Sequence, residues 1–189
     1  MVRCMLPGLM IAACWIALVA YWRISERGVK AAAERQDWRS RLARLPVWLG
    51  YIALLVAGVY PLGPRLFANT DWSEWLGVGI CALGLVLAVW ARKTLGAEWS
   101  QDVELKQGHR LVTRGPYRFV RHPIYTCHLI MGLGTAITFG EIAGFAGCLL
   151  FLLGFWIKLR QEEELLVRYF PEEYPAYKRR VKALVPFVF

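Results

Sequence analysis

The sequence predicts an all-α membrane protein: an integral membrane bundle of about five transmembrane helices, followed by a cytosolic C-terminal helical segment. Of its 189 residues, 57% are hydrophobic and only 20% are charged, whereas soluble domains are typically about 45–50% apolar. Five apolar segments approach the ~20 residues that a spanning helix needs. Basic residues gather in alternate loops, which is typical of multi-pass membrane proteins.

The five expected spans cover about residues 4–22, 45–62, 75–91, 123–139 and 142–157. The first ends in Tyr21–Trp22–Arg23, an interfacial anchor, so we prefer a span to the alternative of a cleaved signal peptide. Only Gly140 and Glu141 separate the last two spans, which predicts a tight helical hairpin. Between the first two spans, residues 30–35 are rich in helix formers and predict a short surface helix.

The loop charges predict how the chain is oriented. Residues 23–44, 92–121 and 158–182 are rich in lysine and arginine, whereas the other two loops contain Arg65 as their one basic residue. Because basic loops stay in the cytoplasm, five spans place the N-terminus outside and the C-terminus in the cytoplasm. This topology, with basic loops that face anionic lipid, then explains most of the net charge of +9. We therefore expect no nucleic-acid partner.

The cysteines and histidines give no sign of a metal site. The five cysteines lie in or beside apolar segments without any CxxC pair, so we interpret them as free buried thiols. The three histidines lack a spacing typical of metal ligands, and His128, inside the fourth span, is assigned no role. Gly132 and Gly134 in the same span favour close helix packing, with close passage of a ligand as the alternative.

One of two polar cytosolic segments, residues 108–125, has features of a ligand site. Gly115–Pro116 indicates a turn, and Pro123 suits the first turn of the fourth helix. The unpaired N–H groups at that helix start, with Arg118 and Arg121 nearby, are suited to a ligand carboxylate. The alternative is a row of arginines that contact lipid phosphates.

The other polar segment, residues 158–164, continues the fifth span out of the membrane. It contains Glu162, Glu163 and Glu164, which are costly near hydrocarbon unless they are solvated or paired. Lys158 and Glu162 are four residues apart and share one helix face. The segment is either a solvated charge run or the source of a carboxylate that binds a ligand, on the same membrane face as residues 108–125.

Together these segments resemble the isoprenylcysteine carboxyl methyltransferase family, within the wider group that includes phospholipid N-methyltransferases. The motifs that carry the resemblance are Leu95–Gly96, Trp99–Ser100, His109–Thr113, Gly115–Arg118, Arg121–Tyr125, Glu162–Glu163, Phe170, Glu173–Tyr174, Tyr177, Arg180–Val181 and Pro186. The resemblance covers the C-terminal half. It implies a membrane enzyme that uses S-adenosylmethionine, with residues 1–189 as a single domain and about residues 95–189 as the cofactor region.

The resemblance also implies the site residues. Those expected to bind S-adenosylmethionine are His109, Arg110, Leu111, Val112, Tyr117, His122, Pro123, Ile124, Tyr125 and Glu162. Lys158 stands where relatives have an arginine that pairs with the substrate carboxylate, and it keeps the charge but loses the two-pronged geometry. Arg121 is the second expected substrate contact. No acid or base residue is expected, because a carboxylate is already ionised at neutral pH.

The expected function is methyl transfer to the carboxylate of a lipophilic, isoprenylcysteine-like acceptor, which gives a methyl ester. Three alternatives stay open: N-methylation of a phospholipid, reduction by a related membrane enzyme that uses NADPH, and a non-catalytic scaffold. The expected partners are an oily or prenylated substrate and membrane lipid, with no metal.

Overall fold

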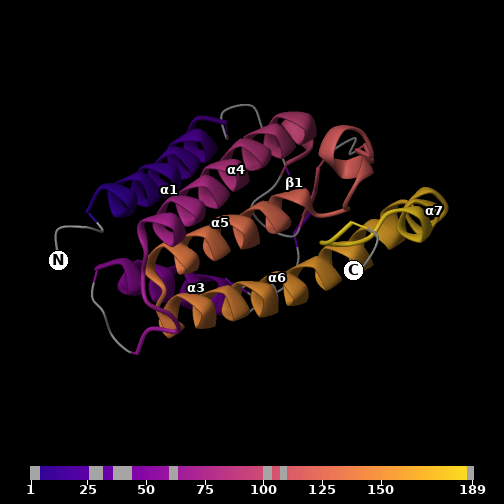
Figure 1. Ribbon diagram of the computed structural model, residues 1–189. Coiled ribbons are helices and arrows are strands. Elements are labelled where there is room, and N and C mark those ends of the chain that lie inside the picture. Colours follow the sequence, from indigo (N-terminus) through magenta and orange to yellow (C-terminus); the bar gives the residue numbers. More distant parts are fainter. Residues whose placement is uncertain are drawn as a thin grey trace.

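The computed structural model describes residues 5–25, 32–35, 44–59, 64–99, 104–106 and 110–186. Its helices are α1 (Met5–Ser25), α3 (Arg44–Val59), α4 (Asp71–Leu95), α5 (Pro123–Phe139), α6 (Ile142–Tyr169) and α7 (Glu173–Arg180), with 3-10 turns η1 (Gly96–Glu98) and η2 (Gly115–Arg118). In Figure 1, α4 lies between α1 and α5, and α6 packs against α5 and α3. The short α7 follows α6 at one end of the bundle.

The helices carry the apolar surface expected of a membrane protein. Three helical segments are long and apolar enough to cross a bilayer: Leu6–Ser25, Asp71–Glu98 and Ile142–Tyr169. The apolar helices α3 and α5 are shorter, at 16 and 17 residues. Large apolar side chains point outward, such as Leu9, Leu55 and Leu149, each at least 63% exposed. Hydrocarbon solvates such a surface better than water does, so the predicted helical membrane bundle is confirmed.

Two helices extend beyond the apolar segments that identified them. Helix α4 begins at Asp71 because Thr70 and Ser73 form a capping box, in which the Ser73 N–H donates to Thr70 Oγ1 over 3.1 Å. Helix α6 continues past Ile157 to Tyr169, so the glutamate run lies on the same helix as the last span. Hydropathy marks where a helix crosses the membrane, whereas caps decide where the helix ends.

The predicted hairpin between the last two spans is confirmed. Helix α5 ends at Gly140, whose φ of 68° is left-handed and suits glycine, and α6 begins directly after Glu141. The Gly140 N–H donates to the Ala136 carbonyl over 2.9 Å and closes the last turn of α5. The short connection holds α5 and α6 antiparallel, which places Glu162 on α6 beside the first turn of α5.

Close packing of α4 on α5 depends on paired glycines. A Cβ atom added at Gly134 would lie 2.5 Å from the backbone nitrogen of Cys81 and 2.6 Å from the carbonyl oxygen of Gly77. The prediction of close helix packing at Gly134 is therefore confirmed, as in other membrane helix pairs with small residues at their contact.

We expect Gly134→Ala to destabilise the protein by about 1–3 kcal/mol, because the new methyl group meets backbone that has no room to shift. Gly79→Ala on α4 is the matched control, since its Cβ would meet nothing within 4 Å. Thermal unfolding in detergent compares the two variants. Equal unfolding temperatures would contradict close packing at Gly134.

The predicted surface helix over residues 30–35 was wrong for the part that the structure describes. Residues Ala32–Arg35 form strand β1, which pairs antiparallel with strand β2, Glu104–Lys106. Helix propensity differs by only a few tenths of a kcal/mol among ordinary residues. Backbone pairing with a segment about 70 residues away overrides this preference, and a local pattern cannot reveal it.

Candidate functional site

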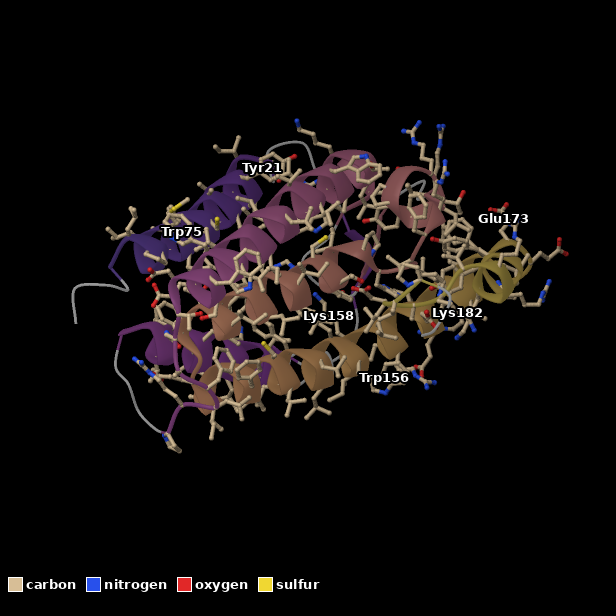
Figure 2. All side chains as sticks on the ribbon, viewed as in Figure 1. Tyr21, Trp75, Trp156, Lys158, Glu173 and Lys182 are labelled. Atoms are coloured by element: carbon tan, nitrogen blue, oxygen red, sulfur yellow. The ribbon has the colours of Figure 1, made fainter. Side chains whose placement is uncertain are left out.

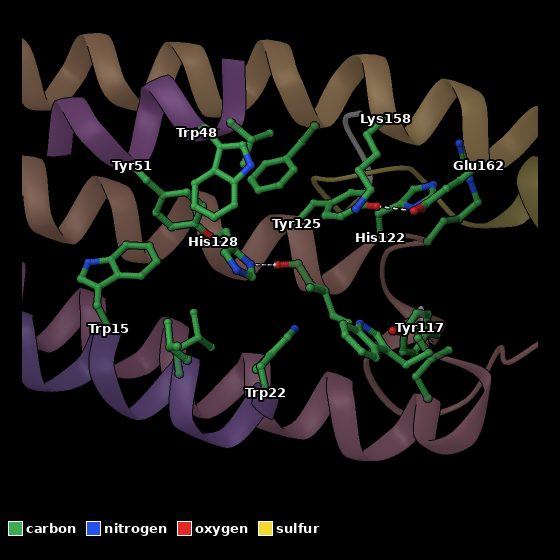
Figure 3. Close-up of a pocket in the computed structure, with 18 of the residues that line it drawn as sticks. Trp15, Trp22, Trp48, Tyr51, Tyr117, His122, Tyr125, His128, Lys158 and Glu162 are labelled. Atoms are coloured by element: carbon green, nitrogen blue, oxygen red, sulfur yellow. Dashed lines mark hydrogen bonds and ion pairs between the residues drawn. The ribbon is translucent and has the colours of Figure 1, made fainter. Parts of the chain in front are cut away.

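A cavity of about 870 Å³ lies among α1, α3, α5 and α6 and reaches η2 and α7 at one end. Its volume falls within the ~300–1,000 Å³ usual for small-molecule sites. Polar and charged side chains line one end: Arg110, Tyr117, Arg121, His122, Tyr125, Lys158 and Glu162. The other end contains His128 and is lined by apolar and aromatic side chains: Trp15, Trp22, Trp48, Tyr51, Leu54 and Phe155. Figure 3 shows both groups around one continuous space.

The polar end is built where α5 begins. His122 is the N-cap residue and Pro123 occupies the first turn, as the sequence predicted. The N–H groups of Arg121 and His122 donate to the carbonyls of Lys182 and Ala183 over 2.8 and 3.0 Å. The C-terminal segment 182–184 therefore fixes the backbone from which the site side chains project.

His122 is held between two carboxylates. Its Nδ1 lies 3.5 Å from Glu162 Oε2, and its Nε2 lies 3.2 Å from Glu163 Oε1. Burial by itself would lower the pKa of His122, but the hydrogen bonds to Glu162 and Glu163 outweigh it and raise the pKa above the ordinary 6.5. The arrangement therefore favours an imidazolium that bridges the two glutamates.

We expect stability to fall with rising pH because of His122. A raised pKa in the folded state means that the stabilisation is complete below about pH 6.5 and is lost as the pH rises through the folded-state value. Thermal unfolding of the wild type and of His122→Asn, from about pH 6 to about pH 9, tests this linkage. The advantage of the wild type over the variant must shrink with rising pH; a constant difference would contradict the bridge.

Glu162 faces the cavity beside a stack of rings. The Tyr125 hydroxyl donates a hydrogen bond to Glu162 Oε1. The Tyr125 ring lies parallel to that of His122, with centroids 5.5 Å apart, and to that of Phe155, at 4.8 Å. The Glu162 side chain keeps 23% of its surface exposed, so its carboxylate can accept a further hydrogen bond from a ligand.

Glu163, the next residue, forms ion pairs with other residues of the protein. Its side chain is 4% exposed, and its two oxygens lie 2.6 Å from Arg121 Nη2 and from Lys178 Nζ. Arg121 also donates from Nε to Glu163 over 2.8 Å and from Nη1 to the Val181 carbonyl. Arg121 lines the cavity, but its guanidinium is engaged with protein groups. This geometry does not support the substrate contact predicted for it.

Lys158 lies where the polar and apolar ends of the cavity meet. Figure 2 shows its side chain directed inward between α5 and α6, whereas Trp156 lies on the outer side of α6. The Lys158 Nζ is 5.4 Å from the centroid of the Tyr125 ring. It precedes Glu162 by one helical turn, so an ammonium and a carboxylate share this part of the wall.

Other predicted residues form the opposite wall. Tyr117 is buried in η2, where its carbonyl accepts a hydrogen bond from the Tyr177 hydroxyl and burial raises the pKa of its phenol. The Arg110 N–H donates to Glu98 Oε2 over 3.2 Å. Leu111, Val112 and Ile124 also line the cavity.

Among the described residues predicted for the site, Pro123 does not line the cavity. Pro123 is buried in the first turn of α5, and His109 lies outside the described residues. Sequence reasoning missed the aromatic end and His128. The available signal for His128 was a polar residue inside an apolar span. Across the described ranges, no group of three or more His, Cys, Asp or Glu is placed to hold a metal ion.

Comparison with known proteins identifies related sequences. Residues 72–173, more than half of the chain, match the family model described as phospholipid methyltransferase. The nickel-cobalt-cadmium resistance protein NccN of Alcaligenes xylosoxydans xylosoxydans is 29% identical over 170 residues, which cover 86% of this chain and 74% of that protein. The protein-S-isoprenylcysteine O-methyltransferase of Schizosaccharomyces pombe is 34% identical over 133 residues, which cover 66% and 55%.

A solved structure agrees with these matches. The eukaryotic intramembrane Ras methyltransferase, an isoprenylcysteine carboxyl methyltransferase, has a TM-score of 0.55 and 25% identity, and the match covers 82% of this chain and 55% of that one. The chain thus spans little more than half the length of these two methyltransferases. The matches confirm the resemblance drawn from the motifs and imply a methyl donor. The chain belongs to the phospholipid methyltransferase family.

Proposed function

We propose that this protein transfers a methyl group from S-adenosylmethionine to the carboxylate of a lipophilic acceptor, giving a methyl ester. The observation that carries the proposal is the single cavity that joins the polar end at Glu162, Tyr125 and His122 to an apolar, aromatic end. Relatives named for methylation of protein-S-isoprenylcysteine support an acceptor of the same class, an oily group attached near a carboxylate.

The residues of the polar end fit S-adenosylmethionine. A sulfonium, an amine and ribose hydroxyls call for carboxylate oxygens and aromatic faces. Glu162 offers the carboxylate, and Tyr117 and Tyr125 offer the rings. The remaining residues assigned to it are Arg110, Leu111, Val112, His122 and Ile124, with Pro123 shaping the backbone. When bound, S-adenosylmethionine supplies an electrophilic methyl group.

The acceptor occupies the other end, with its carboxylate beside Lys158 and its oily part among the aromatic side chains. A carboxylate oxygen bonds to the methyl carbon as the carbon–sulfur bond breaks, and no proton moves, so the site needs no base. The chain contributes alignment of the two ligands and exclusion of water. Because opposite charges cancel during the transfer, a dry cavity favours the reaction.

We also propose the membrane orientation that the loop charges predict. Helix α7 and the residues after it contain Lys178, Arg179, Arg180 and Lys182, and they adjoin the polar end of the cavity. Basic segments remain in the cytoplasm, which places this end and the C-terminus there and the N-terminus outside. S-adenosylmethionine, made in the cytoplasm, then reaches the site from water and the acceptor from lipid.

Methyl-labelled S-adenosylmethionine tests the proposal directly. The full chain in phospholipid vesicles receives the labelled donor and a farnesyl thioether acid, and the lipid extract is then treated with base. We expect label in the extract that base releases as methanol, since esters hydrolyse. Label that resists base and stays with phosphatidylethanolamine would replace the proposal by amine methylation, the alternative that the family description supports.

We expect Lys158→Met to reduce turnover of the farnesyl thioether acid about 10–100-fold, because a charge-assisted hydrogen bond to the carboxylate is lost. Arg160→Met is the matched control, since Arg160 is exposed on the same helix and lies over the Trp156 ring. Inhibition by the neutral amide of the same acid reports the oily contacts alone. If Lys158→Met weakens amide binding equally, Lys158 is not the carboxylate partner.

A further inference from the structure

His128 lies at the apolar end of the cavity, where four helices meet. Its ring is surrounded by those of Trp15 and Trp22 from α1, Tyr51 from α3 and Phe155 from α6, with centroids 5.6–6.4 Å from its own. The residue is 8% exposed and belongs to the cavity wall. Figure 3 shows it on the wall opposite Trp22, away from Glu162. Burial of a histidine in such apolar surroundings costs stability, and buried polar residues of this kind are usually functional.

The hydrogen bond of His128 fixes which nitrogen carries a proton. Its Nδ1 lies 2.8 Å from the carbonyl oxygen of Ile124, one turn earlier on α5. A carbonyl can only accept, so Nδ1 is the donor, and the neutral ring keeps a lone pair on Nε2. Among the described residues, the hydrogen bonds of His128 leave Nε2 unpaired on the wall of the cavity. Nε2 of His128 is therefore a strong hydrogen-bond acceptor at the apolar end, and a ligand that carries a donor can bind to it.

We infer that Nε2 of His128 accepts a hydrogen bond from the acceptor molecule, and that this molecule is a lipophilic carboxylate whose apolar, ring-containing body carries a hydroxyl group. The inference rests on the proposed function for the placement of the carboxylate beside Lys158. It ranks the acceptors within the proposed class: a bare hydrocarbon chain such as farnesyl fills this end but offers no donor to Nε2, so it binds more weakly than a hydroxylated body.

The energetics favour a hydroxylated body over a bare one. A hydrocarbon that fills this end removes water from Nε2 and leaves the lone pair unpaired, whereas a hydroxyl replaces the lost water. Sites built around a polar group reject analogues that lack its partner more strongly than apolar pockets reject an extra methylene. The surrounding aromatic rings suit a planar body, which can pack edge to face against them.

The geometry also sets where the hydroxyl lies. His128 follows Tyr125 by three residues, which is about 4.5 Å of rise along α5. Lys158 lies over the Tyr125 ring, and the Phe155 ring lies between those of Tyr125 and His128 in a continuous contact series. The carboxylate beside Lys158 and the hydroxyl beside His128 thus bind at the two ends of this contact series, and a planar body that spans the Phe155 ring reaches both.

Three naphthoates of nearly equal size test the inference. We use 2-naphthoate, 6-hydroxy-2-naphthoate, whose hydroxyl is far from the carboxylate, and 1-hydroxy-2-naphthoate, whose hydroxyl is bonded internally to it. Equilibrium dialysis of the full chain in nanodiscs, corrected with empty nanodiscs, gives each dissociation constant. We expect the 6-hydroxy compound to bind about tenfold more tightly than the other two. Equal binding of all three by the wild type would overturn the inference.

Variants of His128 assign the preference to this residue. In His128→Phe the ratio between 6-hydroxy-2-naphthoate and 2-naphthoate should fall to about one, whereas His128→Gln, which retains an acceptor, should keep part of it. Each naphthoate partitions into lipid equally with both proteins, so partitioning cancels when the wild-type ratio is compared with the variant ratio. An unchanged ratio in His128→Phe would overturn the assignment. The wild-type ratio remains decisive if that variant fails to fold.

The binding assay contains no methyl donor, so its outcome is independent of methyl transfer. Absence of a base-labile methyl ester in the vesicle assay, together with an intact hydroxyl preference, would overturn the proposed reaction and leave the role of His128 standing. Formation of a methyl ester together with equal binding of the three naphthoates would support the proposed reaction and overturn the role of His128.

Discussion

Replacement of Glu163 by glutamine should lower the thermal unfolding temperature by about 10 °C. The side chain is 4% exposed and neutralises Arg121, Lys178 and the His122 imidazolium. Glutamine preserves the shape but leaves Arg121 and Lys178 near one another without their shared counter-charge, while His122 keeps only Glu162. Loss of one partner from a buried ion pair costs about 3–5 kcal/mol, which gives a shift of this size in a chain of this length.

Glu164→Gln is the control for this prediction, because Glu164 is exposed on the same helix and carries the same charge. Its unfolding temperature is expected to match that of the wild type. The measurement is thermal unfolding of both variants in one detergent, followed by light scattering and intrinsic fluorescence. A small shift for Glu163→Gln, comparable to that of the control, would show that the network contributes little to folding.

Replacement of the neighbouring Glu162 by glutamine should have the opposite pattern: near-normal unfolding and a loss of S-adenosylmethionine binding of about 10–100-fold. Glu162 is partly exposed to the cavity, and its oxygens face Tyr125 and His122. Removing its charge weakens a charge-assisted hydrogen bond to the ligand by about 1.5–3 kcal/mol. The ion pairs of Glu163 with Arg121, Lys178 and His122 stay in place, and glutamine can still hydrogen-bond to His122, so we expect only a small loss of stability.

Equilibrium binding of labelled S-adenosylmethionine to detergent-purified protein measures this effect, again with Glu164→Gln beside it. Normal affinity in Glu162→Gln would remove Glu162 from the proposed cofactor site. A fall in affinity accompanied by a fall of about 10 °C in unfolding temperature, as expected for Glu163→Gln, would mean that Glu162 supports the fold instead. The two adjacent glutamates therefore give a paired test in which each serves as a reference for the other.

Much of the fold could be predicted from the sequence because its signals are local. Apolar runs identified the helices, two residues between Phe139 and Ile142 gave the hairpin, and Pro123 marked the start of α5. Gly134 revealed close helix packing because small residues are the usual device for it. Each of these features depends on neighbours within one or two helical turns.

The features that sequence reasoning missed depend on contacts between distant segments. A local charge pattern made Arg121 a ligand contact, but Glu163, 42 residues later, engages its guanidinium. The pattern Glu162–Glu163–Glu164 does not show which carboxylate faces the cavity, since that depends on the rotation of α6 against α5. His128 had no predicted role because its meaning comes from rings on three other helices.

The C-terminal segment 182–184 holds the start of α5 in place, and this has a consequence for the biogenesis of the protein. The carbonyls of Lys182 and Ala183 accept hydrogen bonds from the N–H groups of Arg121 and His122. The Leu184 carbonyl accepts a hydrogen bond from the Thr126 hydroxyl. Translation proceeds from the N-terminus, so the ribosome releases these residues after all of the described helices, α1 to α7. A nascent chain can therefore insert all its helices while its ligand pocket is still unfinished. Competence to bind a ligand is acquired only after residues 182–184 have been made and have docked on α5.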